Sequence, residues 1–156
     1  MRKTMTVTIA AEGRDKGKVF HLEEMSARQA ERWARRALAE MVRSGAQIPE
    51  DIVSSGWGGL LAMGARGLFG AAGPEIDALH DELLACVALQ PDPHHPEVKR
   101  RLIDDDTEEI ATLELLKDEV FKLHSGFSIA AALSKIFAAA RSVIEPMLTT
   151  STSAES

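Results

Sequence analysis

The chain has 156 residues, a hydrophobic content of 45%, a charged content of 27% and a formal net charge of −6. These values fit one globular domain with a real core, and they disfavour a nucleic-acid binder, which needs a concentrated basic surface. One cysteine, Cys86, excludes an internal disulfide, no apolar run of about 18 residues predicts a membrane span, and the charged N-terminus does not resemble a signal peptide. We therefore expect a cytoplasmic protein.

Residues 4–24 predict a β-hairpin. The first strand alternates threonines with the apolar residues Met5, Val7 and Ile9. This period of two, with β-branched residues, suits a pleated strand. Glycines in segment 12–18 let the chain reverse, and Phe20 and Leu22 share one face of the returning strand. A two-stranded hairpin is marginal alone, so we interpret it as a scaffold packed on helices, with a potential docking edge.

A helix is predicted over residues 27–44. Ser26 and Gln29 have the spacing of a capping box at its start, and Gly45 follows its end, where a left-handed residue is common. Trp33 lies on its apolar stripe, a position more typical of the core than of a binding anchor. The opposite face carries the arginines Arg28, Arg32, Arg35 and Arg36. We expect this face to be solvated, with intrahelical ion pairs such as Glu31 with Arg35.

Segment 54–73 is rich in glycine, and each glycine inside a helix costs about 1 kcal/mol relative to alanine. Its apolar residues still keep near-helical spacing. We therefore expect a helix of low intrinsic stability over residues 57–72; the alternative is a mobile apolar flap that orders on a partner. No glycine run here precedes Lys-Ser or Lys-Thr, which disfavours a phosphate-binding loop.

The next predicted helix spans residues 74–89. Pro74 occupies its first position, and Cys86 lies on its apolar stripe, as core residues do. Three prolines then mark segment 90–96 as an exposed loop. We expect the adjacent His94 and His95 there to be solvent-exposed, because neighbouring side chains diverge and no cysteine cluster supports a metal site.

The last third of the chain predicts a short strand and two helices. Val98–Ile103 is expected as a third strand that joins the hairpin. Three aspartates at 104–106 lack the ligand spacing of a calcium loop and are expected to precede a helix over 107–124, capped by Thr107. A helix over 128–145 follows after a short connection, so the two are expected to pack antiparallel.

These elements predict an α+β fold that is mostly α-helical. The hairpin, with the short third strand, is expected to pack on about four to five helices in a single globular domain over residues 1–147. Residues 148–156 are small and polar, which predicts a disordered tail.

No catalytic arrangement stands out in the sequence. The five histidines are scattered, and none lies in a Ser-His-Asp, HExxH or Cys-His pattern. We therefore predict a protein that is not an enzyme, with no catalytic residues, no cofactor and no metal.

Two blocks of sequence resemble tail assembly chaperones of long-tailed bacteriophages and prophages. The first block contains Glu12–Phe20, Glu24–Met25 and Ala30–Leu38, and the second contains Arg101–Asp106, Glu108–Thr112, Leu115 and Glu119–Phe127. Together they cover about half of the chain in the expected order. These blocks are patterns of fold, and no catalytic motif lies in them.

The resemblance implies a small, non-catalytic chaperone in the host cytoplasm. Such proteins bind the long tape measure protein and keep it soluble before the tail tube forms around it, and they are absent from the finished virion. The tail tube protein is a further candidate partner, and self-association stays open; no nucleic acid or membrane is expected. A longer form made by ribosomal frameshifting is frequent in this family.

An acidic domain with a soft apolar segment could hold a partner helix in a groove. The residues expected to bind the partner are Trp57, Leu60, Leu61, Leu68 and Phe69, with Trp33 as an alternative anchor. Two other functions remain open. One is a structural protein of the virion tail, such as a tube or terminator subunit. The other is a small DNA-binding regulator that would use the arginines of helix 27–44.

Overall fold

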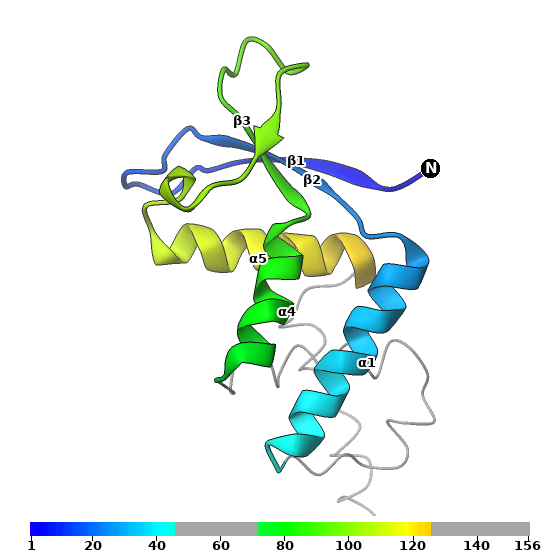
Figure 1. Ribbon diagram of the computed structural model, residues 1–156. Coiled ribbons are helices and arrows are strands. Elements are labelled where there is room, and N and C mark those ends of the chain that lie inside the picture. The colour runs from blue at the N-terminus through cyan, green and yellow to red at the C-terminus, as the bar shows by residue number, and fades with distance from the viewer. Residues whose placement is uncertain (46–71, 126–156) are drawn as a thin grey trace, which may run out of the picture.

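The computed structural model describes residues 1–45 and 72–125. Its strands form one antiparallel sheet in the order β1-β2-β3-β4, with bounds β1 Thr4–Thr8, β2 Val19–Glu23, β3 Val87–Gln90 and β4 Arg100–Arg101. Its α-helices are α1 Ala27–Arg43, α4 Pro74–Leu84 and α5 Ile110–Ser125, and a single 3-10 turn, η1, covers Asp104–Asp106. The three α-helices lie on one side of the sheet (Figure 1).

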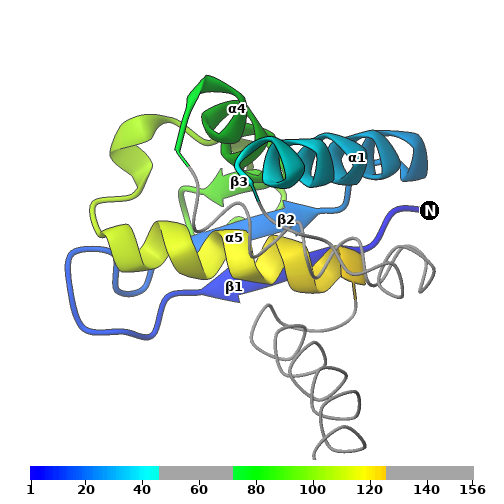
Figure 2. The same ribbon diagram turned by 90° about the horizontal axis from the view of Figure 1, so that it is seen from below.

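This arrangement is the predicted α+β class. The expected helices 57–72 and 128–145 lie outside the described residues. The same holds for the expected tail 148–156 and for the antiparallel packing expected between helix 128–145 and the helix before it. Within the described residues, α5 lies across β1 and β2, while α1 and α4 lie side by side beyond it (Figure 2). No helix within residues 1–45 or 72–125 is long and apolar enough to cross a bilayer.

The core lies between the sheet and the helices. Its fully buried members come from every layer: Phe20 and Leu22 from β2, Leu79 from α4, and Leu116 and Val120 from α5. Phe20 and Leu22 face the helices because they alternate along β2, and their cross-strand partners Leu89 and Val87 share that face. The indole N–H of Trp33 donates to the Leu79 carbonyl at 3.0 Å, and the side chain is buried. Trp33 is therefore a core residue, as its position on the apolar stripe of the helix predicted.

The predicted ends of α1 are confirmed. Ser26 is the N-cap, and its hydroxyl accepts a hydrogen bond from the Gln29 amide at 3.2 Å. Gly45 follows the helix with a φ of +91°, a conformation that L-residues with a side chain rarely adopt. On the exposed face, Arg35 and Glu31 form the predicted pair at 2.7 Å.

The prediction of a single helix over residues 74–89 is wrong at its end. Helix α4 begins at Pro74 as expected but ends at Leu84, and Val87–Gln90 forms strand β3. The pairing starts just before β3, where the Glu23 amide donates to the Cys86 carbonyl at 3.0 Å. A short apolar run suits a helix or a strand, and the open edge of β2 decides for the strand because it supplies backbone partners.

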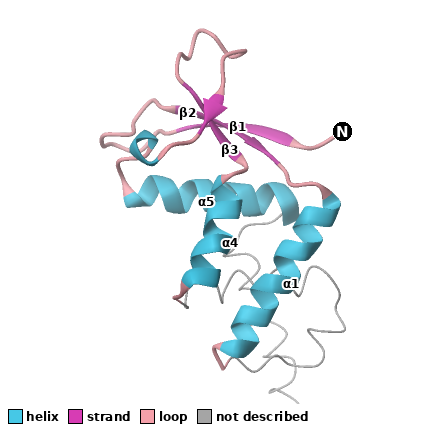
Figure 3. Cartoon of the chain, in the orientation of Figure 1, coloured by secondary structure: helices cyan, strands magenta, loops and turns pink. Residues whose placement is uncertain are grey.

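The predicted strand Val98–Ile103 is only partly present. Just two of its residues, Arg100 and Arg101, form β4, and they pair with Leu89 and Ala88 of β3. The predicted strand therefore joins the sheet by pairing with β3, and the expectation that it pairs with the N-terminal hairpin is wrong. Long loops connect β1 to β2 and β3 to β4 (Figure 3).

The C-terminal end of α5 is joined to the segment before α1. His124 Nε2 accepts a hydrogen bond from the Met25 amide at 2.8 Å, and its Nδ1 lies 2.8 Å from the Val120 carbonyl. The ring therefore donates through Nδ1 and accepts through Nε2, which satisfies one backbone donor and one backbone acceptor. This histidine helps to hold α5 across the sheet.

Candidate partner-docking site

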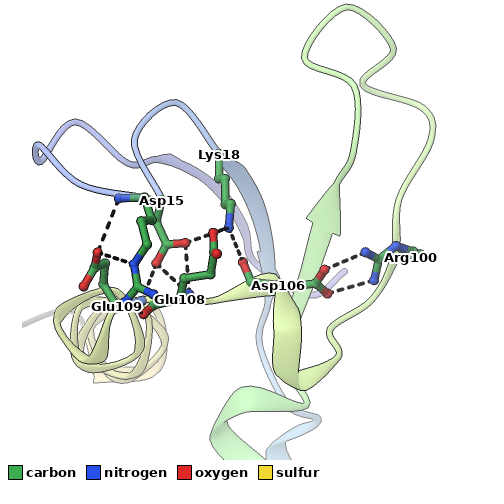
Figure 4. Close-up of polar contacts among 7 residues, drawn as sticks. Asp15, Lys18, Arg100, Asp106, Glu108 and Glu109 are labelled. Carbon is green, nitrogen blue, oxygen red and sulfur yellow. Dashed lines mark hydrogen bonds and ion pairs between the residues drawn. The ribbon is translucent and has the colours of Figure 1, made fainter.

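The start of α5 is held by a carboxylate from the loop between β1 and β2. Asp15 is 1% exposed, and its oxygens accept hydrogen bonds from the backbone amides of Glu108 at 3.0 Å and Glu109 at 2.9 Å. Lys18 completes the arrangement with an ion pair to Asp15 at 2.7 Å (Figure 4). A loop distant in sequence thus supplies the acceptor for the two backbone amides that directly precede α5.

Lys18 and Arg14 extend this contact to the segment before α5. The Lys18 ammonium also donates to the Asp106 carbonyl at 3.1 Å and to the Glu108 carboxylate at 3.0 Å. Arg14 pairs with the Glu109 carboxylate at 2.9 Å and donates to the Glu108 carbonyl. These bonds fix the loop against the chain that leads into α5.

A second carboxylate holds η1 against β4. Asp106 accepts two hydrogen bonds from the Arg100 guanidinium, at 2.8 and 2.5 Å, and one from the Ile103 amide at 2.8 Å. Such a bidentate contact fixes orientation as well as distance. We call Asp15, Lys18, Arg100, Asp106, Glu108 and Glu109 the ionic cluster; Figure 4 shows these six side chains between the loop, η1 and β4.

The pKa values of both buried carboxyls are lowered. Burial alone would raise the pKa of Asp15, but hydrogen bonds from Lys18, Thr112 and the two backbone amides outweigh it and hold the pKa far below its usual range. The Arg100 guanidinium is the main reason that the pKa of Asp106 is lowered, and the Ile103 amide adds to the effect against the cost of burial. Both groups are therefore ionised at neutral pH.

The predicted cap at Thr107 is wrong. Thr107 is extended, with φ −118° and ψ 119°, and α5 begins three residues later at Ile110. The Asp15 carboxylate instead binds the Glu108 and Glu109 amides just before the helix, and its hydrogen bond with the Thr112 side chain reaches the first turn. Asp15 and Glu108 are 93 positions apart, so no local sequence pattern could have indicated the contact.

The segment held by the ionic cluster forms one wall of an open groove of about 370 Å³. The apolar lining consists of Leu84, Ala85, Val87, Leu102, Ile103 and Leu113. It therefore draws on the end of α4, the start of β3, the segment after β4 and the first turn of α5. We call this feature the α4–α5 groove.

Two large apolar side chains at the groove are strongly exposed. Ile103 lies in the lining and is 56% exposed, and Ile110, one helical turn before Leu113, is 79% exposed. Residues three apart on a helix are neighbours on its surface, so Ile110 is an exposed apolar neighbour of the lining residue Leu113. An apolar surface that a single chain leaves open marks a place where another molecule can bind.

The charged residues that line the α4–α5 groove are more often acidic than basic. Asp81 and Asp104 lie in its lining, together with one cation, Arg101. Asp77 lies one turn before Asp81 on α4, and Asp105 follows Asp104, and all four carboxylates are exposed. No ion pair within residues 1–45 and 72–125 involves any of these four aspartates.

A second hollow of about 330 Å³ includes His21 on β2 and Cys86. Burial, with Lys99 as a lesser cause, lowers the pKa of His21, and its buried Nδ1 has no hydrogen-bond partner in the described structure. Burial also raises the pKa of the Cys86 thiol to about 11, so the thiol is protonated at neutral pH. A protonated thiol is a poor nucleophile, so Cys86 is not activated for nucleophilic attack.

Neither a metal site nor the basic face of α1 is as strong a candidate binding site as the α4–α5 groove. In the described ranges, no three His, Cys, Asp or Glu side chains gather as a metal site would need. His94 and His95 are exposed, as predicted. On α1, Arg36 pairs with Glu82 of α4 and Arg35 with Glu31, so half of the four arginines on this face are already neutralised.

The five residues predicted to bind a partner lie outside the described residues: Trp57, Leu60, Leu61, Leu68 and Phe69. The α4–α5 groove was missed by sequence reasoning. Its one available signal was the apolar pair Ile103 and Ile110 on either side of an acidic run. Comparison with family models, with curated proteins and with solved structures found no match for this chain.

Proposed function

We propose that the chain is a non-catalytic tail assembly chaperone of a long-tailed phage or prophage. It binds the tape measure protein in the host cytoplasm, keeps it soluble, and is left out of the finished virion. The proposal begins from the two sequence blocks that resemble this family. Asp15 and Lys18 belong to the first block, and their partners Asp106 and Glu108 belong to the second.

The observation that carries the proposal is the exposed apolar wall made by the second block. Ile103 and Ile110 remain open to solvent at 56% and 79%, while the ionic cluster holds the segment between them in place. A pre-formed apolar surface can cover the apolar stripe of another chain without losing conformational entropy on binding. Such cover is what a long, aggregation-prone helical protein requires before assembly.

Co-expression with fragments of the tape measure protein tests this function. That protein is expected from a very long gene just downstream, with a tail tube gene just upstream. We expect wild-type chain to raise the soluble fraction of a fragment severalfold and to co-purify with it. The Ile103→Asp/Ile110→Asp variant should lose most of this effect. Val98→Asp is the matched control, because Val98 is 51% exposed and lies in the β3–β4 loop.

Two results would contradict the proposal. The first is a failure of wild-type chain to bind any tape measure fragment. The second is its presence as a stoichiometric component of purified particles, which would favour a structural tail protein. Replacing Trp57, Leu60, Leu61, Leu68 and Phe69 by polar residues in the same assay tests whether that predicted face also contributes.

A further inference from the structure

We propose that the α4–α5 groove binds one amphipathic helix whose apolar stripe is flanked by lysine or arginine residues. This inference rests on the proposed function, because it specifies the chemistry of the segment that the chaperone would shelter. It follows from three properties of the groove: its apolar lining, its charge, and the state of the neighbouring sheet edge.

The apolar lining of the groove favours a partner whose side chains are spaced as they are on a helix. The groove runs between the last turn of α4 and the first turn of α5, and its volume of about 370 Å³ accommodates a few aliphatic side chains. A helix presents such side chains in a row at spacings of three and four residues. The exposed Ile103 and Ile110 then supply apolar contact beside that row.

The charge selects basic flanks. Asp81 of α4 and Asp104 after β4 lie in the lining of the groove, and the exposed Asp77 and Asp105 are close to them in the sequence, one helical turn before Asp81 and directly after Asp104. Helix α4 also ends at the groove, with no basic residue in its last turn, so the partial negative charge of its carbonyls adds to the aspartates. Against these stands one lining cation, Arg101. The net field favours a partner that carries Lys or Arg next to its apolar stripe.

The sheet edge disfavours an extended partner. β4 has only two residues, and the Ile103 amide beside it already donates to the Asp106 carboxylate at 2.8 Å. An added strand needs a row of free backbone donors and acceptors, which this short edge does not offer. The groove is therefore suited to side-chain contacts with a helix.

The described helices of a second copy do not fit this groove. Helix α1 is rich in arginine, but its apolar residues Trp33, Ala34 and Ala37 are buried against the core, at 1–2% exposure. A second copy would have to unfold to present that face. Helix α1 of a second copy therefore does not supply the partner helix, and we assign the partner to a different chain.

Binding of synthetic helices tests the inference. Two labelled peptides of about 18 residues carry the same leucine and alanine stripe, one flanked by lysines and the other by glutamates. By fluorescence anisotropy with the full chain at low salt, we expect the lysine peptide to bind at least about tenfold more tightly. Raising the salt should reduce this preference, because exposed charges are screened.

Matched variants locate the binding. Asp81→Asn/Asp104→Asn/Asp105→Asn should remove most of the preference for lysine while leaving apolar binding, and Ile103→Asp should weaken both peptides. Asp92→Asn/Glu97→Gln, in the exposed β3–β4 loop, should change neither affinity. Circular dichroism checks that each variant remains folded.

The inference is overturned if the two peptides bind equally, or if Ile103→Asp leaves binding intact. A dimer in light scattering that Ile103→Asp converts to a monomer would also overturn it, because the occupant would then be a second copy. Failure of the two proposals is distinguishable. Tape measure fragments that bind when the peptides do not would remove only the groove inference. Peptides that bind when no fragment does would remove only the proposed function.

Discussion

The two loops at the ends of the sheet's hairpins are both polar and charged, yet the contacts that hold them in place differ. In the β1–β2 loop, Asp15 is 1% exposed and bonds to two amides of the chain leading into α5. In the β3–β4 loop, all residues from 91 to 99 are exposed. Its side-chain bonds stay local, such as that of the His94 amide to Asp92 at 2.8 Å.

The comparison shows that a charged residue contributes most to stability when it is buried and bonded to a distant part of the chain. Asp92 and His95 lie 3.8 Å apart with both side chains exposed to solvent, where side-chain entropy and screening cancel most of any attraction. Asp15 is removed from water, so each of its hydrogen bonds counts and each lost partner leaves a buried polar group unpaired. Three predictions sharpen this difference, from the largest expected effect to the smallest.

Removing the carboxylate of the first loop should be the most damaging change. We expect Asp15→Ala to lower the free energy of unfolding by about 3 kcal/mol, because it leaves the Glu108 and Glu109 amides and the Lys18 ammonium without their partner. Asp92→Ala in the second loop should change it by no more than about 0.5 kcal/mol. Urea unfolding of both variants measures the contrast, and similar losses would contradict it.

Acid should destabilise the fold through the same carboxylate, that of Asp15. The pKa of Asp15 is lowered by folding, so the unfolded chain binds its proton first, and the stability that Asp15 contributes is complete above about pH 4 and is lost as the pH falls further. Between pH 5 and pH 3, Asp15 alone should account for about 1 kcal/mol of the loss.

Asp15→Asn removes this titration, so its unfolding midpoint should fall less steeply over that range than the wild-type midpoint. Asp92→Asn should keep the wild-type slope. A wild-type slope in Asp15→Asn would show that the acid sensitivity arises elsewhere, for example at Asp106, whose pKa is also lowered.

The smallest expected effect concerns the carboxylate that joins η1 to β4. Asp106→Asn keeps the shape of the side chain but weakens its contact with Arg100, and we expect a loss of about 1 kcal/mol. Glu97→Gln in the second loop, which removes the negative charge beside His95, should leave the unfolding midpoint unchanged. Thermal unfolding of the pair compares them, and equal midpoints would mean that the Asp106 contact adds nothing.

Much of the fold followed from local patterns. Alternating threonines predicted β1, the Ser26 hydroxyl and Gly45 bounded α1, and Pro74 began α4, because each of these signals depends on neighbours within a few positions. The core position of Trp33 followed from its place on an apolar stripe. These features belong to the sequence alone, since backbone preference and hydrophobic period are set residue by residue.

The tertiary structure decided the rest. Val87–Gln90 became a strand because β2 offered an unpaired edge, and Asp15 binds the chain just before α5 because folding brings together residues 93 positions apart. The α4–α5 groove exists only where α4, β3 and the segment after β4 meet. Contacts of this kind depend on which surfaces are removed from water together, and that is a property of the whole packed chain.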